Sequence, residues 1–564
     1  MSAVRAVNPV IRGFAPDPSV IRVGDWYHLA TSSFEWFPTI PLFRSRDLAS
    51  WEPAGAVDTA VPGRSLLGVP DSGGIWAPAL SHADGVFWVV YSVVRSVGTR
   101  FFDLTTYVSI TDDVTGPWSE PVRVPGHGFD PSLLHHDGRH YLLNLQNDSR
   151  VGGRRFDGIV LTELGVPKPG GRPDASRIHA IGPTRLLLQR EELVEGPKIT
   201  AKDGWFYLLL AQGGTGVEHG VLVARSRSLT GPYEVDAVPL LTTRDDRGVP
   251  LQKAGHGELV QAPSGAWFLS HLASRPLETE QGPRNPLGRE TAIQRVEWVD
   301  GWPRLAHGGW HPAVEIDVTD AVTVSDDAVV AAVGPSEEDM GSDGFGTVPG
   351  WPWSTLREPA GDWLDRTSRP GYVRLVGRMG PESLWQQSLL AQRLTEHHAE
   401  VEVTVEASPV TFTQSAGLVL YYNTTSYLQL HLTWAEPAGQ PQAGQQWRGV
   451  GRRVLRLEHG RPEDARVVAE VDAPSGPVRL AARIDGGTAR MFAGTAGGEL
   501  HPVGPDLDFT DLSDDFGPRL RFTGALAGIS VVDLVEGTFH ADFTGWALRQ
   551  TAAPQWRSAG WAAS

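Results

Sequence analysis

The chain has 564 residues, with 49 basic and 66 acidic side chains, a net charge of −17 and no cysteine. This length predicts two domains. The acidic balance, with no basic stripe, argues against a nucleic-acid partner, and the lack of cysteine excludes disulfides, thiolate metal sites and cysteine nucleophiles. The N-terminus has no signal-like apolar stretch, and no apolar run approaches the roughly 20 residues that span a bilayer. We therefore expect a cytoplasmic protein without a membrane partner.

A short motif occurs five times in the first 300 residues. In each copy a lead residue opens an apolar run, which ends at a Gly-Asp, Asp-Gly or Ser-Gly pair followed by an aromatic residue. Such pairs between apolar runs are typical of two-residue hairpin turns, so each copy predicts a β-hairpin. The lead residues, spaced 54 to 65 residues apart, are Asp17, Trp76, Asp130, Glu195 and His256.

Hairpins that repeat at this period are typical of propeller blades rather than of a solenoid. A second recurring motif, such as Thr111–Trp118, follows the hairpins and suits the turn between the third and fourth strands of a blade. Because the innermost strand of each blade begins beside the central axis, we expect the five lead residues to meet at one end of the channel. The sequence thus predicts an all-β chain whose residues 1–318 form a five-bladed β-propeller.

The sequence changes character after the propeller. Residues 319–344 are acidic, rich in small residues and free of the repeat, and they predict a linker. Beyond them, apolar and polar residues alternate in segments separated by turns, for example in 400–406 and 427–433. This period of two predicts that residues 345–564 form an antiparallel β-sandwich of the jelly-roll or concanavalin-like type.

Three carboxylic acids, an indole and an imidazole that face one another have the composition of an active site. In glycoside cleavage one carboxylic acid protonates the leaving oxygen, and one carboxylate activates water or attacks the sugar. A third acid near the proton donor raises the pKa of that donor by like-charge repulsion. Asp17, Asp130 and Glu195 can fill these roles, but their spacing does not allot them. The extra methylene of Glu195 favours it as the acid.

Six motifs stand out, at residues 8–19, 31–38, 73–78, 195–197, 285–291 and 294–298. They resemble those of glycoside hydrolase family 43, and in particular of its two-domain β-xylosidases. The resemblance spans the first domain, and the C-terminal half is similar to the sandwich appended to those enzymes. It implies an inverting exo-glycosidase that releases xylose from the non-reducing end of β-1,4-xylo-oligosaccharides. α-L-Arabinofuranosidase activity on arabinoxylan fragments, alone or combined, is the alternative.

The resemblance also implies a role for each acid. Asp17 would be the general base, Glu195 the general acid, and Asp130 the residue that orients this acid and tunes its pKa. Inversion implies carboxyl groups roughly 6.5–9.5 Å apart with a water between them. Arg289 matches an arginine that contacts the sugar in the non-reducing-end subsite.

Further residues of the pocket follow from the same resemblance. Phe34 and Trp76 match pocket walls, and Phe522 matches the part of the sandwich that reaches over the pocket and favours exo-type release. His256 matches a histidine near the channel centre, where many members hold a hydrated calcium, although no cofactor is required. One departure is Ala79, which stands where relatives usually carry an acid, so the substrate preference stays open.

Structural explanations compete with each of these roles. An Asp-Pro-Ser motif is most often a turn or a cap, His256 can satisfy backbone carbonyls, Arg289 can form an interblade salt bridge, and the aromatic residues can pack in a core. The sandwich can be a scaffold or the interface of a homo-oligomer. Two further functions stay open, a sugar-binding propeller without chemistry and a retaining five-bladed fructosidase. The sequence contains neither a zinc-type His motif nor a phosphate-binding loop.

Overall fold

The structure, a computed structural model, describes residues 3–323 and 344–553, except residues 347, 349, 438 and 440–448. Within these ranges the regular structure is β-strand apart from five short 3₁₀ helices, so the predicted all-β class is confirmed. None of the helices in the described ranges has the length and apolar character needed to cross a membrane. The 3₁₀ helices are η1 (Pro62–Arg64), η2 (Pro169–Gly171), η3 (Ala175–Arg177), η4 (Thr319–Ala321) and η5 (Phe509–Asp511).

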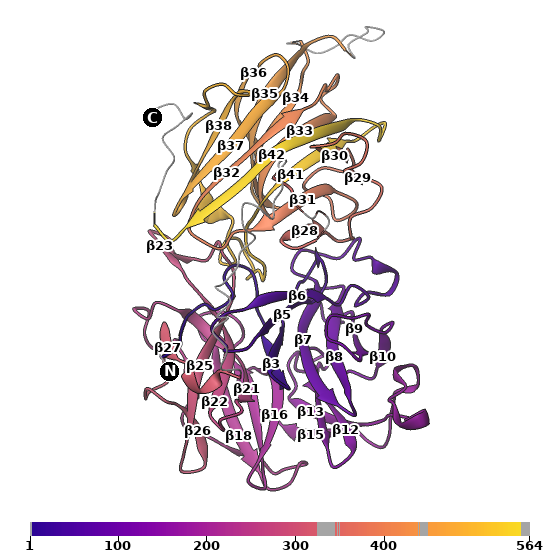
Figure 1. The fold of residues 1–564 in the computed structure, drawn as a ribbon, viewed down its shortest axis with the longest axis vertical. Helices are drawn as coiled ribbons and strands as arrows, with labels where there is room; N and C mark the ends of the chain where they lie inside the picture. Colours follow the sequence, from indigo (N-terminus) through magenta and orange to yellow (C-terminus); the bar gives the residue numbers. More distant parts are fainter. Residues whose placement is uncertain are drawn as a thin grey trace. The chain divides into compact units, whose positions relative to one another are not determined.

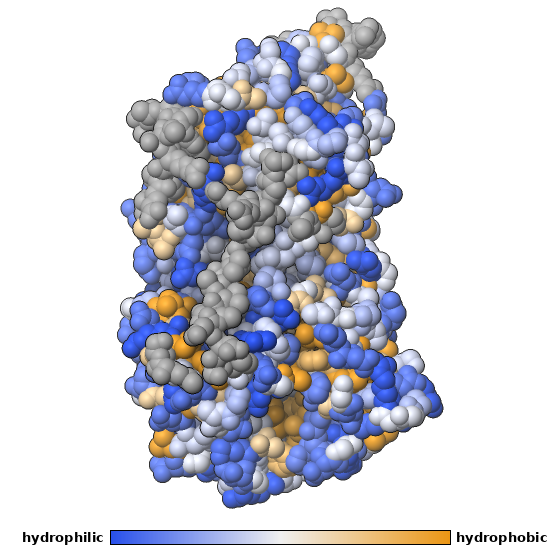
Figure 2. All heavy atoms as spheres, in the orientation of Figure 1, coloured by the Kyte–Doolittle hydropathy of each residue, from blue (hydrophilic) through white to orange (hydrophobic). Residues whose placement is uncertain are grey.

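The chain divides into two compact units. The first takes the described residues up to 276 and from 289 to 323, and the second takes residues 277–288 together with those from 344 onward. Figure 1 shows the strands of both units, coloured along the sequence. On the face drawn in Figure 2 hydrophilic residues predominate and apolar ones form separate patches.

The first unit is the predicted five-bladed propeller. Its blades are antiparallel sheets of four strands, with a fifth short strand in blades 3 and 4. Blade 1 contains β2 (Ser19–Val23), β3 (Trp26–Ala30), β5 (Pro41–Ser45) and β6 (Glu52–Ala56). Blade 2 contains β7 (Gly74–Ala83), β8 (Val86–Val94), β9 (Leu104–Thr111) and β10 (Val122–Val124). Blade 3 contains β11 (Ser132–His136), β12 (Arg139–Leu145), β13 (Ile159–Gly165), β14 (His179–Ala180) and β15 (Arg185–Leu188).

The remaining blades complete the ring. Blade 4 contains β16 (Val194–Lys202), β17 (Trp205–Gln212), β18 (Gly220–Ser226), β19 (Glu234–Val235) and β20 (Leu241–Thr242). Blade 5 contains β21 (Gln252–Gln261), β22 (Trp267–Ser274), β25 (Glu290–Val299) and β26 (Trp302–Leu305). The innermost strands close a circle, because β2 packs against β7 and β21, β11 against β7 and β16, and β16 against β21. β1 (Arg5–Val7) pairs with β27 (Glu315–Asp317), and β4 (Trp36–Phe37) follows β3 in the chain.

The turn chemistry explains the inner hairpins. In blades 2, 3 and 4 both residues of the Asp-Gly pair have positive φ, as a type I′ turn requires, and the strands are joined by these two residues alone. Blade 5 differs from the prediction, because five residues separate β21 from β22 and Ser264-Gly265 lies inside this longer turn.

The core of the propeller consists of one apolar cluster between each pair of neighbouring blades. Consecutive residues of one strand serve different clusters. Leu208 of β17 faces blade 3 and Leu209 faces blade 5. Strands buried on both faces read as continuous apolar runs, which is why Trp205–Gln212 shows little alternation.

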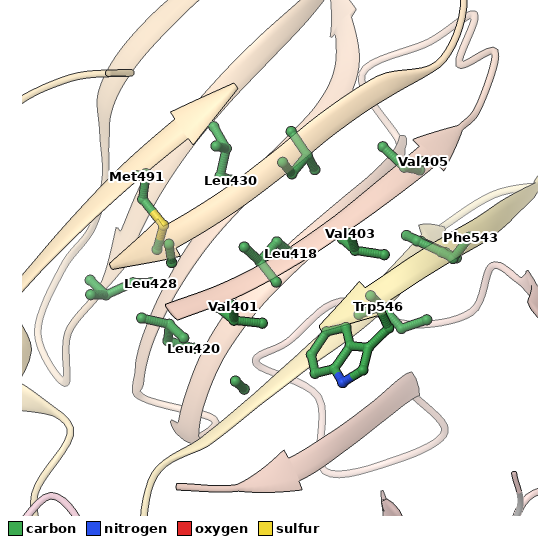
Figure 3. Close-up of a cluster of buried hydrophobic side chains, with 14 of the residues drawn as sticks. Val401, Val403, Val405, Leu418, Leu420, Leu428, Leu430, Met491, Phe543 and Trp546 are labelled. Carbon is green, nitrogen blue, oxygen red and sulfur yellow. The ribbon is translucent and has the colours of Figure 1, made fainter. Parts of the chain in front are cut away.

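The second unit is a β-sandwich. One sheet has the order β36 (Ala465–Asp472), β35 (Arg452–Gly460), β34 (Ser426–Ala435), β33 (Gln414–Asn423), β41 (Leu526–Asp533), β31 (Ser388–Arg393) and β28 (Trp353–Leu356). The other has the order β29 (Leu364–Asp365), β30 (Val373–Val376), β42 (His540–Thr551), β32 (His398–Glu406), β37 (Val478–Asp485), β38 (Thr488–Thr495) and β39 (His501–Pro502), with β40 (Leu507–Asp508) also on β38. Figure 3 shows inward side chains of both sheets, such as Val403 and Leu418, packed against each other.

The predicted domain boundaries miss one excursion. Residues 277–288, between β22 and β25 of blade 5, belong to the second unit, where β23 (Leu277–Thr279) and β24 (Gly282–Arg284) form a hairpin. Leu287 is buried in the core of the sandwich, and the Asn285 N–H donates to Ser513 Oγ at 2.8 Å. The range 1–318 is thus interrupted. Of the predicted linker 319–344, residues 324–343 lie outside the described residues.

Candidate active site

Each inner strand has one residue with a left-handed backbone, either just before the strand or within its first half, and we call this residue the head of the strand. The φ angles of these five residues lie between 40° and 56°, a range that residues with a side chain seldom adopt. Four of the five precede a proline. Such strain persists where the surroundings impose it and clusters at functional sites. The heads are Asp17, Ala77, Asp130, Gly196 and His256.

The predicted equivalence of the five lead residues is therefore wrong for two blades. Trp76 and Glu195 each stand one residue before the left-handed head, and a β-bulge follows each of them in the pairing of the first two strands. A bulge adds a residue to one strand and re-aims the side chains beside it. Glu195 consequently enters the site from a strand position that differs from those of Asp17 and Asp130. Alignment on the prolines would have revealed this offset.

Asp17 is held by an arginine from blade 5. Arg289 Nη1 donates to Asp17 Oδ1 at 2.6 Å and Nη2 to Oδ2 at 3.4 Å. Nη1 also donates to Thr215 Oγ1 at 2.9 Å, and the guanidinium lies 5.5 Å from the centre of the Phe34 ring. Both members of the pair are buried. A charge-assisted pair of this kind fixes the direction of a carboxylate, and it realises the salt bridge that sequence analysis left open for Arg289.

The other two acids interact through like charge. Burial, and after it the Asp17 carboxylate, raise the pKa of Glu195 to about 7 against the opposing effect of Arg289. Glu195 retains some solvent exposure, but protein atoms surround its carboxyl group closely enough for desolvation to dominate. The pKa of Asp130 is raised well above its usual value, first by burial and then by Glu195 and Asp17, while Lys198 and Arg289 oppose the shift. The three predicted acids thus share one electrostatic site.

This arrangement suits proton transfer. An acid whose pKa lies near neutrality is protonated often enough to donate and loses its proton readily enough to react. Two interacting carboxyls titrate as a pair, so the proton belongs to Asp130 and Glu195 together. Asp17, fixed by a guanidinium, is placed to act as a carboxylate.

His256 lies against this group. Its Nδ1 is 4.0 Å from Asp17 Oδ1, and burial lowers its pKa to about 4, with Lys198 and Arg289 acting in the same direction and Asp17 opposing. The imidazole is therefore neutral at physiological pH. A Cβ on Gly196 would lie 3.1 Å from His256 Cε1, so the glycine after the candidate acid leaves room for this ring.

Two predicted aromatic residues form a connected wall. Phe34, with φ of 49°, exchanges two backbone hydrogen bonds with Ile75, of 3.0 and 2.9 Å. This bridge brings the Phe34 ring to 6.1 Å from that of Trp76, edge to face. Trp76 Nε1 donates to the Ser72 carbonyl at 2.9 Å, which fixes the plane of the indole.

Sequence analysis missed several neighbours of these residues. Phe14 packs 5.9 Å from Phe34, and Phe102 and Phe129 pack 5.9 and 5.5 Å from Trp76. Two of these neighbours carried a signal in the sequence, because Phe129 directly precedes Asp130 and Phe14 lies within the motif of residues 8–19. Phe102 lies in a loop, and only the folded propeller brings it to the indole.

Two further predictions concern Ala79 and Phe522. Ala79 is buried in the apolar cluster between blades 2 and 3, where it pairs with Val90. Phe522 lies in the second unit, in the segment before β41, and its role over the pocket stays a prediction.

A hydrated calcium ion near His256 stays a prediction, and the described side chains offer it no cluster of carboxylates. Calcium takes six to eight oxygen ligands, largely from carboxylates and carbonyls. The acid on the same strand, Glu258, is instead paired with the Lys198 ammonium at 3.7 Å. Among the described residues, no group of three or more His, Cys, Asp or Glu side chains could hold a metal ion. A second positive charge beside this ammonium would be repelled.

Comparisons with known proteins identify relatives of both units. Residues 6–303 match the family model of glycosyl hydrolases family 43, and residues 346–548 match that of the β-xylosidase C-terminal concanavalin A-like domain. The chain is 37% identical to xylosidase/arabinosidase 43B of Humicola insolens, over 97% of this chain and 98% of that protein. It is 36% identical to a xylan 1,3-β-xylosidase of Vibrio sp, over 95% and 97% of the two chains. The crystal structure of a xylan β-1,4-xylosidase from Bacillus halodurans superposes with a TM-score of 0.85, at 37% identity, covering 97% of this chain and all of that one.

Proposed function

Because this chain belongs to glycosyl hydrolase family 43, we propose that it is an inverting exo-glycosidase that releases xylose from the non-reducing end of β-1,4-xylo-oligosaccharides. The observation that carries the proposal is the grouping of three acids with different environments. Asp17 is clamped by Arg289, whereas Glu195 has a pKa of about 7 and interacts with the buried Asp130.

The chemistry follows from these environments. Protonated Glu195 donates its proton to the glycosidic oxygen as the bond from this oxygen to the anomeric carbon breaks. A water molecule attacks the anomeric carbon from the opposite face and passes a proton to Asp17. Direct attack by water inverts the anomeric centre, so a β-xyloside yields α-xylose. Arg289 keeps the Asp17 carboxylate directed at the water.

The aromatic wall supports a sugar substrate. Phe34 and Trp76 present apolar ring faces and edges beside Arg289 and the acids, and pockets for small ligands combine apolar walls with a few directed polar groups. We assign these residues to the subsite for the terminal xylose.

The anomer formed first tests the mechanism. Xylobiose hydrolysis followed by proton NMR in the first minutes should give α-xylose, which then equilibrates. Initial β-xylose would overturn the inverting mechanism and favour a covalent intermediate. Glu195→Gln should lose about 10²- to 10⁴-fold in kcat, the usual contribution of a general acid. If the native protein binds xylobiose but does not hydrolyse it, the result favours a sugar-binding propeller without chemistry.

A second candidate is α-L-arabinofuranosidase activity, favoured by the name of the Humicola insolens relative. The ratio of kcat/KM for p-nitrophenyl β-D-xyloside to that for p-nitrophenyl α-L-arabinofuranoside separates the two, and a ratio below one reverses our ranking. The linkage is tested in the same way, because one relative is named for β-1,3 bonds and another for β-1,4 bonds. Comparing 1,3- and 1,4-linked xylobiose measures this preference.

Other expectations from the sequence stay predictions. We expect a cytoplasmic location and no cofactor requirement, and a homo-oligomer stays open. Fractionation of the source cells tests the location, and light scattering of the purified protein measures the oligomeric state.

A further inference from the structure

The second unit contains a cavity of its own. Its volume is about 630 Å³, within the range of roughly 300–1,000 Å³ that is typical of small-ligand sites. The cavity lies where the chain leaves β28, β30 and β41, three strands of the sandwich (Figure 1). All the residues that line it belong to the second unit, so it is distinct from the candidate active site of the propeller.

Acidic side chains outnumber basic ones on the wall of this cavity. The basic residue of the wall is Arg378, and its guanidinium is already engaged. Arg378 donates to Glu358 Oε1 and to the Gln387 carbonyl, and its Nε donates to Ser388 Oγ at 3.1 Å. Because like charges in a binding site repel each other, the wall disfavours an anionic ligand. Its acids are Glu358, Asp362, Asp533 and Glu536.

A buried indole forms part of the same wall. Trp363 is 6% exposed, and the Arg378 guanidinium lies 4.8 Å from the centre of its ring. In the part of the chain that the structure describes, Trp363 Nε1 is buried without a hydrogen-bond partner. A buried indole N–H usually finds an acceptor, and leaving it unpaired costs free energy. A ligand oxygen in the cavity would supply this acceptor.

Exposed apolar side chains gather around the cavity. Met379, Leu534 and Val535 line it and are exposed. Trp385, which is 61% exposed, directly precedes Gln386 of the wall. Single apolar residues scattered over a surface are normal, but a group of them marks an interaction site.

The loop that carries Trp385 is held in place. The Met379 N–H donates to the Gln386 carbonyl at 3.1 Å and closes the loop. Within it, the Gln387 side chain donates to the Ser383 carbonyl at 2.7 Å, and the Trp385 N–H donates to Ser383 Oγ at 3.0 Å. Because the backbone is already fixed, a ligand that packs on this indole orders little of the loop when it binds.

These features match the chemistry of a neutral sugar chain. Sugar hydroxyls donate to carboxylates and accept from an N–H, so they suit both the acids and the indole N–H of Trp363. The apolar C–H face of a pyranose ring can pack on the exposed indole of Trp385. A wholly apolar ligand would remove water from the carboxylates without replacing its hydrogen bonds.

We propose that this cavity and Trp385 form a second saccharide-binding site, which holds a neutral xylan-type chain on the sandwich without cleaving it. The kind of sugar rests on the proposed function, whereas the site itself rests on the cavity and the braced tryptophan beside it. Such a site retains the enzyme on the polymer whose chain ends it trims.

Affinity electrophoresis of the full chain tests the site. Glu195→Gln serves as the parent, because its low turnover leaves the polymer in the gel intact. Soluble arabinoxylan should retard the parent, and adding Trp385→Ala should weaken this binding by about 10-fold, since a central aromatic residue carries much of the energy of such a contact. Trp363→Phe keeps a ring, removes the N–H and should weaken binding about 3- to 10-fold. Binding of parental strength in both variants would overturn the proposal.

Phe412→Ala is the matched control, because it removes another exposed aromatic ring of the second unit, one that does not line the cavity. We expect this variant to be retarded like the parent. Glucuronoxylan, whose acid groups the wall repels, should retard the parent less than arabinoxylan does, and equal retardation would overturn the assignment of a neutral ligand. If Trp385→Ala instead dissociates an oligomer in light scattering and leaves the retardation unchanged, Trp385 belongs to an interface between copies and the proposal is wrong.

The outcomes separate this proposal from the proposed function. If the native protein hydrolyses xylo-oligosaccharides but both tryptophan variants keep full binding, only the second site fails. If the native protein hydrolyses neither xylobiose nor p-nitrophenyl xyloside, while retardation by arabinoxylan depends on Trp385, the proposed function fails and the second site stands.

Discussion

Gly196→Ala probes the space beside the candidate acid. Gly196 has φ of 56°, and an added Cβ would lie 3.1 Å from His256 Cε1 and 3.4 Å from Ala211 Cβ. A left-handed conformation costs a residue with a Cβ about 1–2 kcal/mol. The imidazole must in addition move by a few tenths of an ångström, and its Nδ1 is 4.0 Å from Asp17. The variant should therefore lose both stability and activity.

Gly138→Ala is the matched control for backbone strain. Gly138 has φ of 71° in the turn of blade 3, and a Cβ there meets nothing within 4 Å. Gly138→Ala should lower the free energy of unfolding by about 1 kcal/mol, which corresponds to roughly 2–4 °C in Tm for a domain of this size. Its kcat/KM should stay native. Gly196→Ala should lower Tm by at least as much and reduce kcat/KM by about 10-fold, since small misplacements at a reacting centre are costly. Thermal unfolding measures the Tm of both variants, and turnover of p-nitrophenyl xyloside measures their kcat/KM. Native activity in Gly196→Ala would refute the reasoning.

Further predictions concern the acids, the metal and the second unit. Asp17→Asn should lower kcat by about 10³-fold, within the range of general-base catalysis. Steady-state kinetics on xylobiose measure this loss, and a loss below about 10-fold would contradict the role of Asp17 as the base. Because a pKa of about 7 means that Glu195 loses its proton above neutrality, kcat/KM should fall as the pH rises through 7, and a profile flat to pH 9 would exclude it as the acid. Dialysis against EDTA should leave activity unchanged, and a loss restored by calcium would show that a calcium ion takes part. Phe522→Ala should raise KM several-fold, whereas an unchanged KM would remove this residue from the pocket.

Local chemistry explains why the propeller was predictable. Asp84-Gly85, Asp137-Gly138 and Asp203-Gly204 each impose a two-residue turn through their own backbone preferences. The register of these hairpins needs no knowledge of distant residues, and their period predicts the blades. The acids Asp17 and Asp130 were found for the same reason, since each heads such a hairpin.

Features that depend on tertiary structure were not predictable in this way. The bulges that displace Trp76 and Glu195 by one residue arise in strand pairing, and in the sequence only the later position of the following proline marks them. Lys198 resembles an ordinary strand lysine until the ring of inner strands buries it beside Glu258. The clamp on Asp17 joins residues 272 positions apart, and only the closed propeller brings them together.

The excursion of residues 277–288 has a consequence for anyone who wishes to shorten this enzyme. Truncating the chain before residue 345 would remove the core residues that bury Leu287. Exposing one such leucine to solvent costs about 1.5–3 kcal/mol. The truncated protein would carry an exposed apolar residue in a loop of its fifth blade, a few residues from Arg289 in the sequence. The sequence of the propeller thus contains a segment that belongs to the sandwich. An exchange of either unit must therefore move this loop together with the sandwich.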